Sequence, residues 1–207
     1  HLDQAIDAVA VGAVASAVVL LVLNRVSPSD PLDSILGKIV VQVPPLSIGA
    51  SVARDLFAAG MGRQGGEPRG RAVAPWQATL RDLGATMAGG IFVGFNIAPT
   101  EEIRLLAAEM TTGHLMGLML FSIAVTYAIV FESGFSPDAR RPEEQGFLQD
   151  PVSETAMAYA VSLVVALGAL SLFNEADVAD PIASLVSQTL VLGLPTAIGG
   201  AAGRLVI

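Results

Sequence analysis

Long runs of apolar residues, separated by short polar stretches, set the pattern of this chain. Each run holds about 19 to 24 residues, enough for an α-helix to cross a hydrocarbon core of about 30 Å. The runs lie at residues 5–24, 34–57, 80–98, 113–132, 154–173 and 182–203. They lack the two-residue alternation of a transmembrane β-strand. The pattern predicts an all-α membrane protein with six transmembrane helices in a single transmembrane domain, residues 1–207.

Composition agrees with a membrane protein and narrows the chemistry. Hydrophobic residues make up 53% of the chain and charged residues 14%, with a mean hydropathy of +0.64. A soluble domain carries about 25% charged residues. The absence of cysteine excludes a disulfide framework and a thiolate nucleophile, and two histidines are too few for a histidine-rich metal cage. The net charge of −8 argues against nucleic acid as a partner. The sequence has no P-loop, dinucleotide fingerprint or HExxH motif, so we expect neither an enzyme nor a cofactor.

The basic residues predict the orientation of the helices. Eight arginines lie in or beside the loops 58–79 and 133–153 or at the end of the last run: Arg54, Arg63, Arg69, Arg71, Arg81, Arg140, Arg141 and Arg204. The other loops hold Arg25 and Arg104. Because loops rich in Lys and Arg stay in the cytoplasm, the loops 58–79 and 133–153 are predicted to be cytoplasmic.

Two segments of the chain resemble each other at a constant offset. Residues 24–54 align with residues 174–204 without a gap. The matches include Asn24 with Asn174, Asp30-Pro31 with Asp180-Pro181, Pro45 with Pro195, and Arg54 with Arg204. Shared apolar composition does not explain these polar and proline matches. We interpret them as a parallel duplication, with copies at 3–57 and 153–207 and a helix pair at 76–136 between them. By symmetry, we expect a parent protein of four plus four helices, of which an N-terminal pair would be missing here.

Two adjacent carboxylates stand out in the stretch FNIAPTEEIRLL, residues 95–106. Glu101 and Glu102 follow Pro99, which should end or break the third helix near its outer end. The candidate cation or proton site consists of Glu101, Glu102, Asn96, Thr100 and Glu109. Oxygen ligands of this kind suit hard cations, and the same acids could carry protons if their pKa were raised. Alternatively, the two glutamates lie in a solvated outer loop and cap a helix that begins near residue 102.

The quoted segments also carry a family resemblance. WQATLRDLGATMAGGIFVGFNIAPTEEI, the closing PTAIGGAAGRLVI, and the stretches DPLDSILGKIV and SIGASVAR are similar to a family of uncharacterised bacterial integral membrane proteins. The APTEE segment is the most specific part. The resemblance covers nearly the whole chain and implies additional N-terminal helices and a location in the bacterial inner membrane. It implies topology and no activity.

Two functions follow from these observations. The first is a cation or proton transporter or channel that uses the carboxylates at its outer mouth. The second is a non-catalytic accessory or scaffold subunit of a larger membrane complex, because polar residues inside the apolar runs are few: Lys38, Gln42 and Gln188. The expected partners are the lipid bilayer, a monovalent or divalent cation in the first case, and other membrane subunits in the second.

Overall fold

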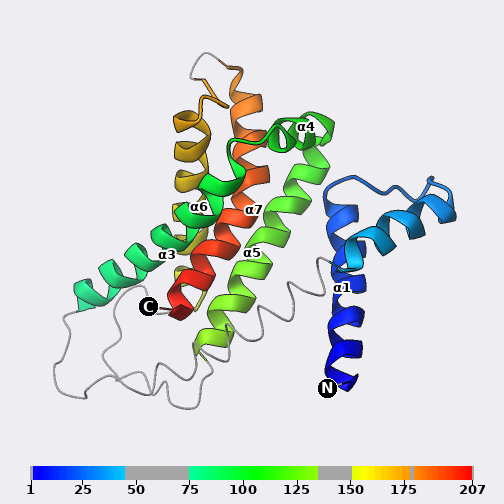
Figure 1. The fold of residues 1–207 in the computed structure, drawn as a ribbon. Coiled ribbons are helices and arrows are strands. Elements are labelled where there is room, and N and C mark those ends of the chain that lie inside the picture. The colour runs from blue at the N-terminus through cyan, green and yellow to red at the C-terminus, as the bar shows by residue number, and fades with distance from the viewer. Residues whose placement is uncertain (1, 45–74, 135–150, 178–179, 207) are drawn as a thin grey trace. The chain divides into compact units, whose positions relative to one another are not determined.

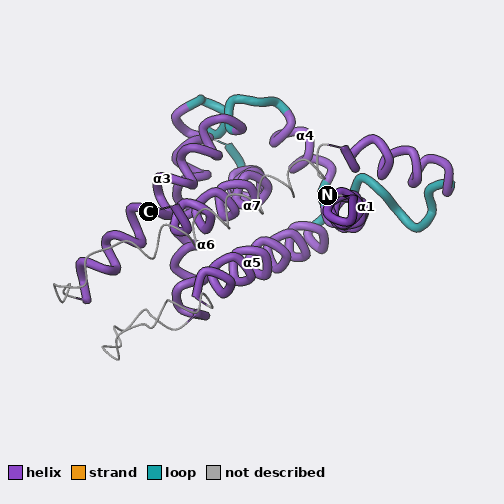
Figure 2. The backbone as a smooth tube through the Cα atoms, turned by 60° about the horizontal axis from the view of Figure 1, so that its bottom comes forward, coloured by secondary structure: helices purple, strands orange, loops and turns teal. Residues whose placement is uncertain are grey.

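The computed structural model describes residues 2–44, 75–134, 151–177 and 180–206, and every regular element in these ranges is a helix (Figure 1, Figure 2). The chain divides into two compact units, His1–Ala59 and Gly60–Ile207. The prediction of an all-α fold is confirmed for the described residues.

The first unit contains two described helices. Helix α1 spans Leu2–Val22, and a second helix begins at residue 32 and is described through residue 44. The Ser16 hydroxyl of α1 donates to the Ile39 carbonyl at 3.3 Å, which ties the two helices together. The second half of the predicted helix 34–57, including Pro45, lies outside the described residues.

The second unit is a helical bundle around α7. Its elements are α3 (Pro75–Ile97), α4 (Glu102–Glu109), α5 (Thr112–Gly134), α6 (Pro151–Leu172) and α7 (Ile182–Val206). Helix α7 packs against all four of the others, and Figure 1 shows it in the middle of the unit. It stays helical through Pro195.

Helices α3 and α7 approach closely because both present glycine at their contact. A Cβ atom on Gly199 would lie 2.6 Å from the Gly89 carbonyl oxygen, and one on Gly203 would lie 2.5 Å from the Ala85 carbonyl oxygen. Both distances are below van der Waals contact, so no side chain fits at these positions. Small residues at helix contacts are typical of membrane bundles, where close backbone packing drives association.

Three described helices are long and apolar enough to cross a membrane: Thr112–Val130, Val152–Leu172 and Ile182–Gly203. They confirm the predicted runs at 113–132, 154–173 and 182–203. A bent pair, Asp82–Ile97 with Glu102–Glu109, makes a fourth span if it is counted as one, and its two helices meet at 90°. In the first unit, the apolar part of α1 is the shorter stretch Val9–Val22. Within the described ranges there are thus three candidate spans, or four if the bent pair counts as one, and the set of six spans stays a prediction.

The same turn follows α1 and α6. Asn24 and Asn174 have left-handed backbones, with φ of 55° and 59°. In each turn the asparagine N–H bonds to the carbonyl three residues back, and the next N–H bonds to the carbonyl five residues back. These bonds are Asn24 N to Leu21 O (3.1 Å), Arg25 N to Leu20 O (2.8 Å), Asn174 N to Ser171 O (3.2 Å) and Glu175 N to Leu170 O (2.8 Å). This is the Schellman arrangement that ends a helix, and asparagine tolerates its left-handed residue.

After each turn comes the aspartate of an Asp-Pro pair, just before the next helix begins. The Asp30 carboxylate accepts the Ser27 N–H at 3.3 Å, and the Asp180 carboxylate accepts the Asp177 N–H at 3.0 Å. These carboxylates therefore close the turn that comes before the helix. In the first unit, the Lys38 ammonium lies 3.3 Å from Asp30. The Ser27 N–H and then Lys38 hold the pKa of Asp30 below its ordinary value of 3.8.

Candidate functional site

The break between α3 and α4 forms the candidate site. Helix α3 ends at Ile97, and the turn that contains Pro99 leads to α4, which begins at Glu102. Proline has no N–H to continue the helical hydrogen bonds, so the chain changes direction here, and the two helices meet at 90°. The prediction that Pro99 ends or breaks the third helix is confirmed, since α3 ends two residues before it.

The two glutamates lie at the start of α4 and are both exposed. Glu101 occupies the N-cap position without a side-chain capping bond. Glu102 lies in the first turn, where the helix dipole stabilises a negative charge. The Thr100 hydroxyl and the backbone N–H of Glu102 itself donate to the Glu102 carboxylate. The Thr100 hydroxyl also donates to the Ile97 carbonyl at 2.7 Å, so two acceptors compete for its one proton.

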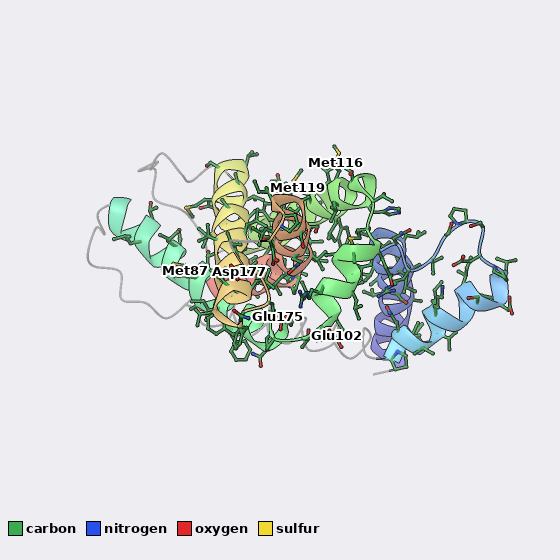
Figure 3. All side chains as sticks on the ribbon, turned by 90° about the horizontal axis from the view of Figure 1, so that it is seen from above. Met87, Glu102, Met116, Met119, Glu175 and Asp177 are labelled. Atoms are coloured by element: carbon green, nitrogen blue, oxygen red, sulfur yellow. The ribbon has the colours of Figure 1, made fainter. Side chains whose placement is uncertain are left out.

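The other predicted ligands are spread around the break. The Asn96 amide donates to the Phe92 carbonyl one turn earlier. Glu109 is the last residue of α4 and is exposed. Within the described ranges, no group of three or more His, Cys, Asp and Glu residues could hold a metal ion. Figure 3 shows the side chains from above, with Glu102, Glu175 and Asp177 among those labelled.

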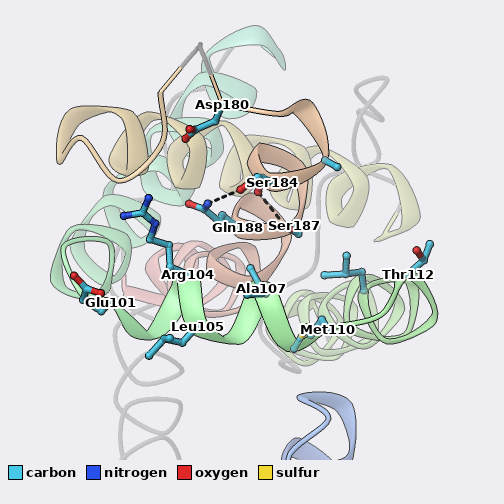
Figure 4. A pocket seen from close by; sticks show the side chains of 13 residues that line it. Glu101, Arg104, Leu105, Ala107, Met110, Thr112, Asp180, Ser184, Ser187 and Gln188 are labelled. Carbon is cyan, nitrogen blue, oxygen red and sulfur yellow. Dashed lines mark hydrogen bonds between the residues drawn. The ribbon is translucent and has the colours of Figure 1, made fainter.

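A pocket of about 660 Å³ lies between α4 and the first turns of α5 and α7. Its polar side chains include Glu101, Arg104, Asp180, Ser184, Ser187 and Gln188, and its apolar wall includes Leu105 and Met110 (Figure 4). Of the five predicted site residues, Glu101 lines this pocket. Helix α4 presents Glu101 and Arg104 to it, together with the buried Ala107, while the other buried residue of α4, Ile103, is outside the lining.

Gln188 lies deepest among the polar residues of the pocket, with 4% of its surface exposed. Its amide nitrogen donates to the Ser184 hydroxyl at 2.9 Å, and the Ser187 hydroxyl donates to the Ser184 carbonyl at 3.0 Å. The amide oxygen of Gln188 is buried and finds no hydrogen-bond partner within the described part of the chain. Arg104 makes a long ion pair of 3.9 Å with Glu175.

The sequence predicted one acid of the pocket and missed the rest of its wall. Ser184, Ser187 and Gln188 are spaced three and four residues apart, so they share one face of an otherwise apolar helix. That spacing was the available signal for a polar surface on α7. Arg104 gave no such signal, because its place in the wall depends on how α4 lies against α7.

The helices long enough to span a bilayer, together with the bent pair, define the class of this molecule: a helical integral membrane protein. Over residues 1–207, the chain matches the model of the family described as "Putative integral membrane protein (DUF2391)", and it belongs to that family. The predicted kinship with a family of integral membrane proteins is thereby confirmed. No curated protein and no solved structure matched the chain.

Proposed function

We propose that this protein is a multi-pass protein of the bacterial inner membrane that passes a small cation or a proton, which it binds with carboxylates at the outer mouth. The observation that carries the proposal is the position of Glu101. This carboxylate lies at the break of a bent helix pair and lines a pocket of about 660 Å³. Broken helices recur at the binding sites of membrane transporters, because their free ends and polar side chains can face a cavity.

The charge around the pocket supports a cation as the ligand. Glu101 and Asp180 line it from two different elements, and each contributes a negative charge. Arg104 also lines it, but its guanidinium pairs with Glu175 outside the lining. The sum over these four side chains is negative, which favours a positively charged ligand over an anion.

The proposed architecture is six spans built from a parallel duplication, with copies at 3–57 and 153–207. The matching Schellman turns at Asn24 and Asn174, and the matching aspartate contacts that follow them, support it. Under this proposal the loops 58–79 and 133–153 lie in the cytoplasm, and the break at Glu101 lies on the opposite side.

The two adjacent glutamates provide the test, since Glu101 lines the pocket and Glu102 is exposed outside its lining. Purified protein is reconstituted into liposomes that contain reporters for Ca²⁺, Mn²⁺ or H⁺. We expect Glu101→Gln to reduce flux at least tenfold, on the order of losing one charge-assisted contact, and Glu102→Gln to retain it. Equal flux in wild type, Glu101→Gln and the double variant would reject the proposal.

A second candidate is a non-catalytic accessory subunit of a larger membrane complex. The buried hydroxyls of the bundle favour it, because Ser122, Thr126 and Ser162 each donate to a carbonyl one turn earlier. Hydroxyls that bond to their own helix in this way are satisfied without a ligand, which suits a role in helix packing. This candidate predicts no flux from folded wild-type protein, together with a partner that copurifies stoichiometrically with both wild type and the Glu101→Gln/Glu102→Gln variant.

A further inference from the structure

The free amide oxygen of Gln188 points to a ligand that donates hydrogen bonds. A buried acceptor without a partner is costly and therefore rare in folded proteins, so it points to a group that satisfies it. The rest of the Gln188 side chain is held in place, since its amide nitrogen donates to Ser184. Figure 4 shows Gln188 reaching from α7 and Arg104 from α4 among the pocket residues.

The first unit shows what an occupant of such a position looks like. Lys38 aligns with Gln188 in the repeat, and Asp30 aligns with Asp180. The Lys38 ammonium donates to the Arg25 carbonyl at 2.7 Å and to the Asp30 carboxylate at 3.3 Å. The chain thus supplies its own ammonium group there. Lys38 lines a pocket of about 660 Å³ in the first unit, and in the second unit Gln188 takes the place of the lysine and lines a pocket of the same volume with Asp180.

We propose that the pocket between α4, α5 and α7 binds the primary ammonium group of a small organic amine, with Gln188 and Asp180 as acceptors. The inference deepens the proposed function and rests on it for the sign of the ligand charge. An ammonium group has three N–H donors, which suit an amide oxygen and a carboxylate together. The volume of about 660 Å³ falls in the range of pockets that hold whole organic molecules, and it is far larger than a bare metal ion needs.

The orientation of the Gln188 amide gives the inference a sharp alternative. Turned by 180°, the amide would receive the Ser184 hydroxyl on its oxygen and leave its NH₂ group free. A free NH₂ group would favour an anion beside Arg104. The carboxylates of Glu101 and Asp180 oppose that choice, and a pair of probes of opposite charge decides it by experiment.

The test measures binding to the purified full chain in phosphatidylcholine nanodiscs by thermal shift and by titration. The probes are ethylammonium, tetramethylammonium, which has the same charge and no N–H donor, and acetate. We expect ethylammonium alone to bind and to raise Tm. Gln188→Met should weaken ethylammonium binding about tenfold, as expected for a lost bond to a charged group. Thr189→Val is the matched control, because Thr189 bonds to its own helix and lies outside the pocket lining.

A second variant reproduces the arrangement of the first unit. Gln188→Lys places an ammonium group of the chain itself in the pocket, so we expect a higher Tm without ligand and no further shift with ethylammonium. A variant that merely misfolds would have a lower Tm, so the higher Tm distinguishes the expected result from misfolding. Protection by acetate, equal protection by tetramethylammonium, or unchanged ethylammonium binding in Gln188→Met would each overturn the inference.

Two further experiments identify the source of the amine and test the proposed function independently of the binding site. If phosphatidylethanolamine in the nanodisc competes with ethylammonium, the occupant is a lipid headgroup, and if it does not compete, the occupant is a soluble amine. Ethylammonium binding without ion or amine flux in liposomes would reject passage across the membrane and leave the binding site standing. Flux that survives in Gln188→Met, together with no amine binding in wild type, would reject the amine site and leave passage across the membrane standing.

Discussion

At the scale of single residues, Asn174 carries a backbone conformation that most side chains avoid. Its φ of 59° lies in the left-handed region, where a Cβ-bearing residue costs about 1–2 kcal/mol and asparagine or glycine costs less. We predict that Asn174→Ala lowers the free energy of unfolding by about 1 kcal/mol, while Asn174→Gly leaves it nearly unchanged. Denaturation of the purified protein, followed by circular dichroism, checks both. An alanine variant as stable as the glycine variant would show that this turn is not under strain.

The lowered pKa of Asp30 predicts a pH dependence of stability that arises from this one carboxylate. Because its folded-state pKa lies below the ordinary 3.8, its charged form stabilises the fold above that pH, and the contribution is lost as the pH falls through the lowered pKa. Wild type should therefore be more stable than Asp30→Asn at neutral pH, and the difference should shrink below pH 3.8.

The comparison is made by thermal melting of both proteins across the acid range. All other acids titrate in both proteins, so the difference isolates Asp30. A gap that stays constant from neutral to acid pH would mean that the Ser27 and Lys38 contacts of Asp30 do not depend on its charge.

At the scale of elements, the sequence predicted the long helices, and of the short helix α4 it predicted only the start near residue 102. The bilayer demands about 20 apolar residues per span, so α5, α6 and α7 could be located within a few residues. Helix α4 has eight residues, among them Glu102, Arg104 and Glu109, and no apolar run marks it. The same limit applies to the site. Glu101 was recognisable beside Pro99, but the pocket exists only because α4 turns back against α7.

The contact of α3 with α7 gives an element-scale prediction. Gly199→Ala should destabilise the protein by about 2 kcal/mol, since the added methyl would meet the Gly89 carbonyl oxygen at 2.6 Å and force the helices apart. Gly84→Ala on α3 is the matched control, because nothing lies within 4 Å of its added Cβ. Alanine there should be neutral or should stabilise the helix by up to about 1 kcal/mol. Equal effects at the two glycines would show that α3 and α7 can separate without cost.

At the scale of the whole molecule, the two units repeat one local design with different side chains. Each ends a helix with a left-handed asparagine, closes the next turn with an aspartate, and begins a new helix after Asp-Pro. The polar residue two turns into that new helix is Lys38 in one unit and Gln188 in the other. Lys38 and Gln188 each line a pocket of about 660 Å³. If the copies arose by duplication, the exchange of lysine for glutamine would have removed the ammonium group of the chain itself, which is why we propose the second copy as the one that binds an amine.

A parallel duplication requires both Asp-Pro turns to face the same side of the membrane, which can be tested because the chain contains no cysteine. Ser27→Cys and Asp177→Cys lie at matching positions of the two turns. In intact cells, a membrane-impermeant maleimide should label both, and cysteines placed in the loops 58–79 and 133–153 should react only after the membrane is opened. Labelling of Asp177→Cys but not of Ser27→Cys would mean that an odd number of crossings separates the two turns. The copies would then have opposite orientations, and the predicted set of six spans would have to lose or gain one.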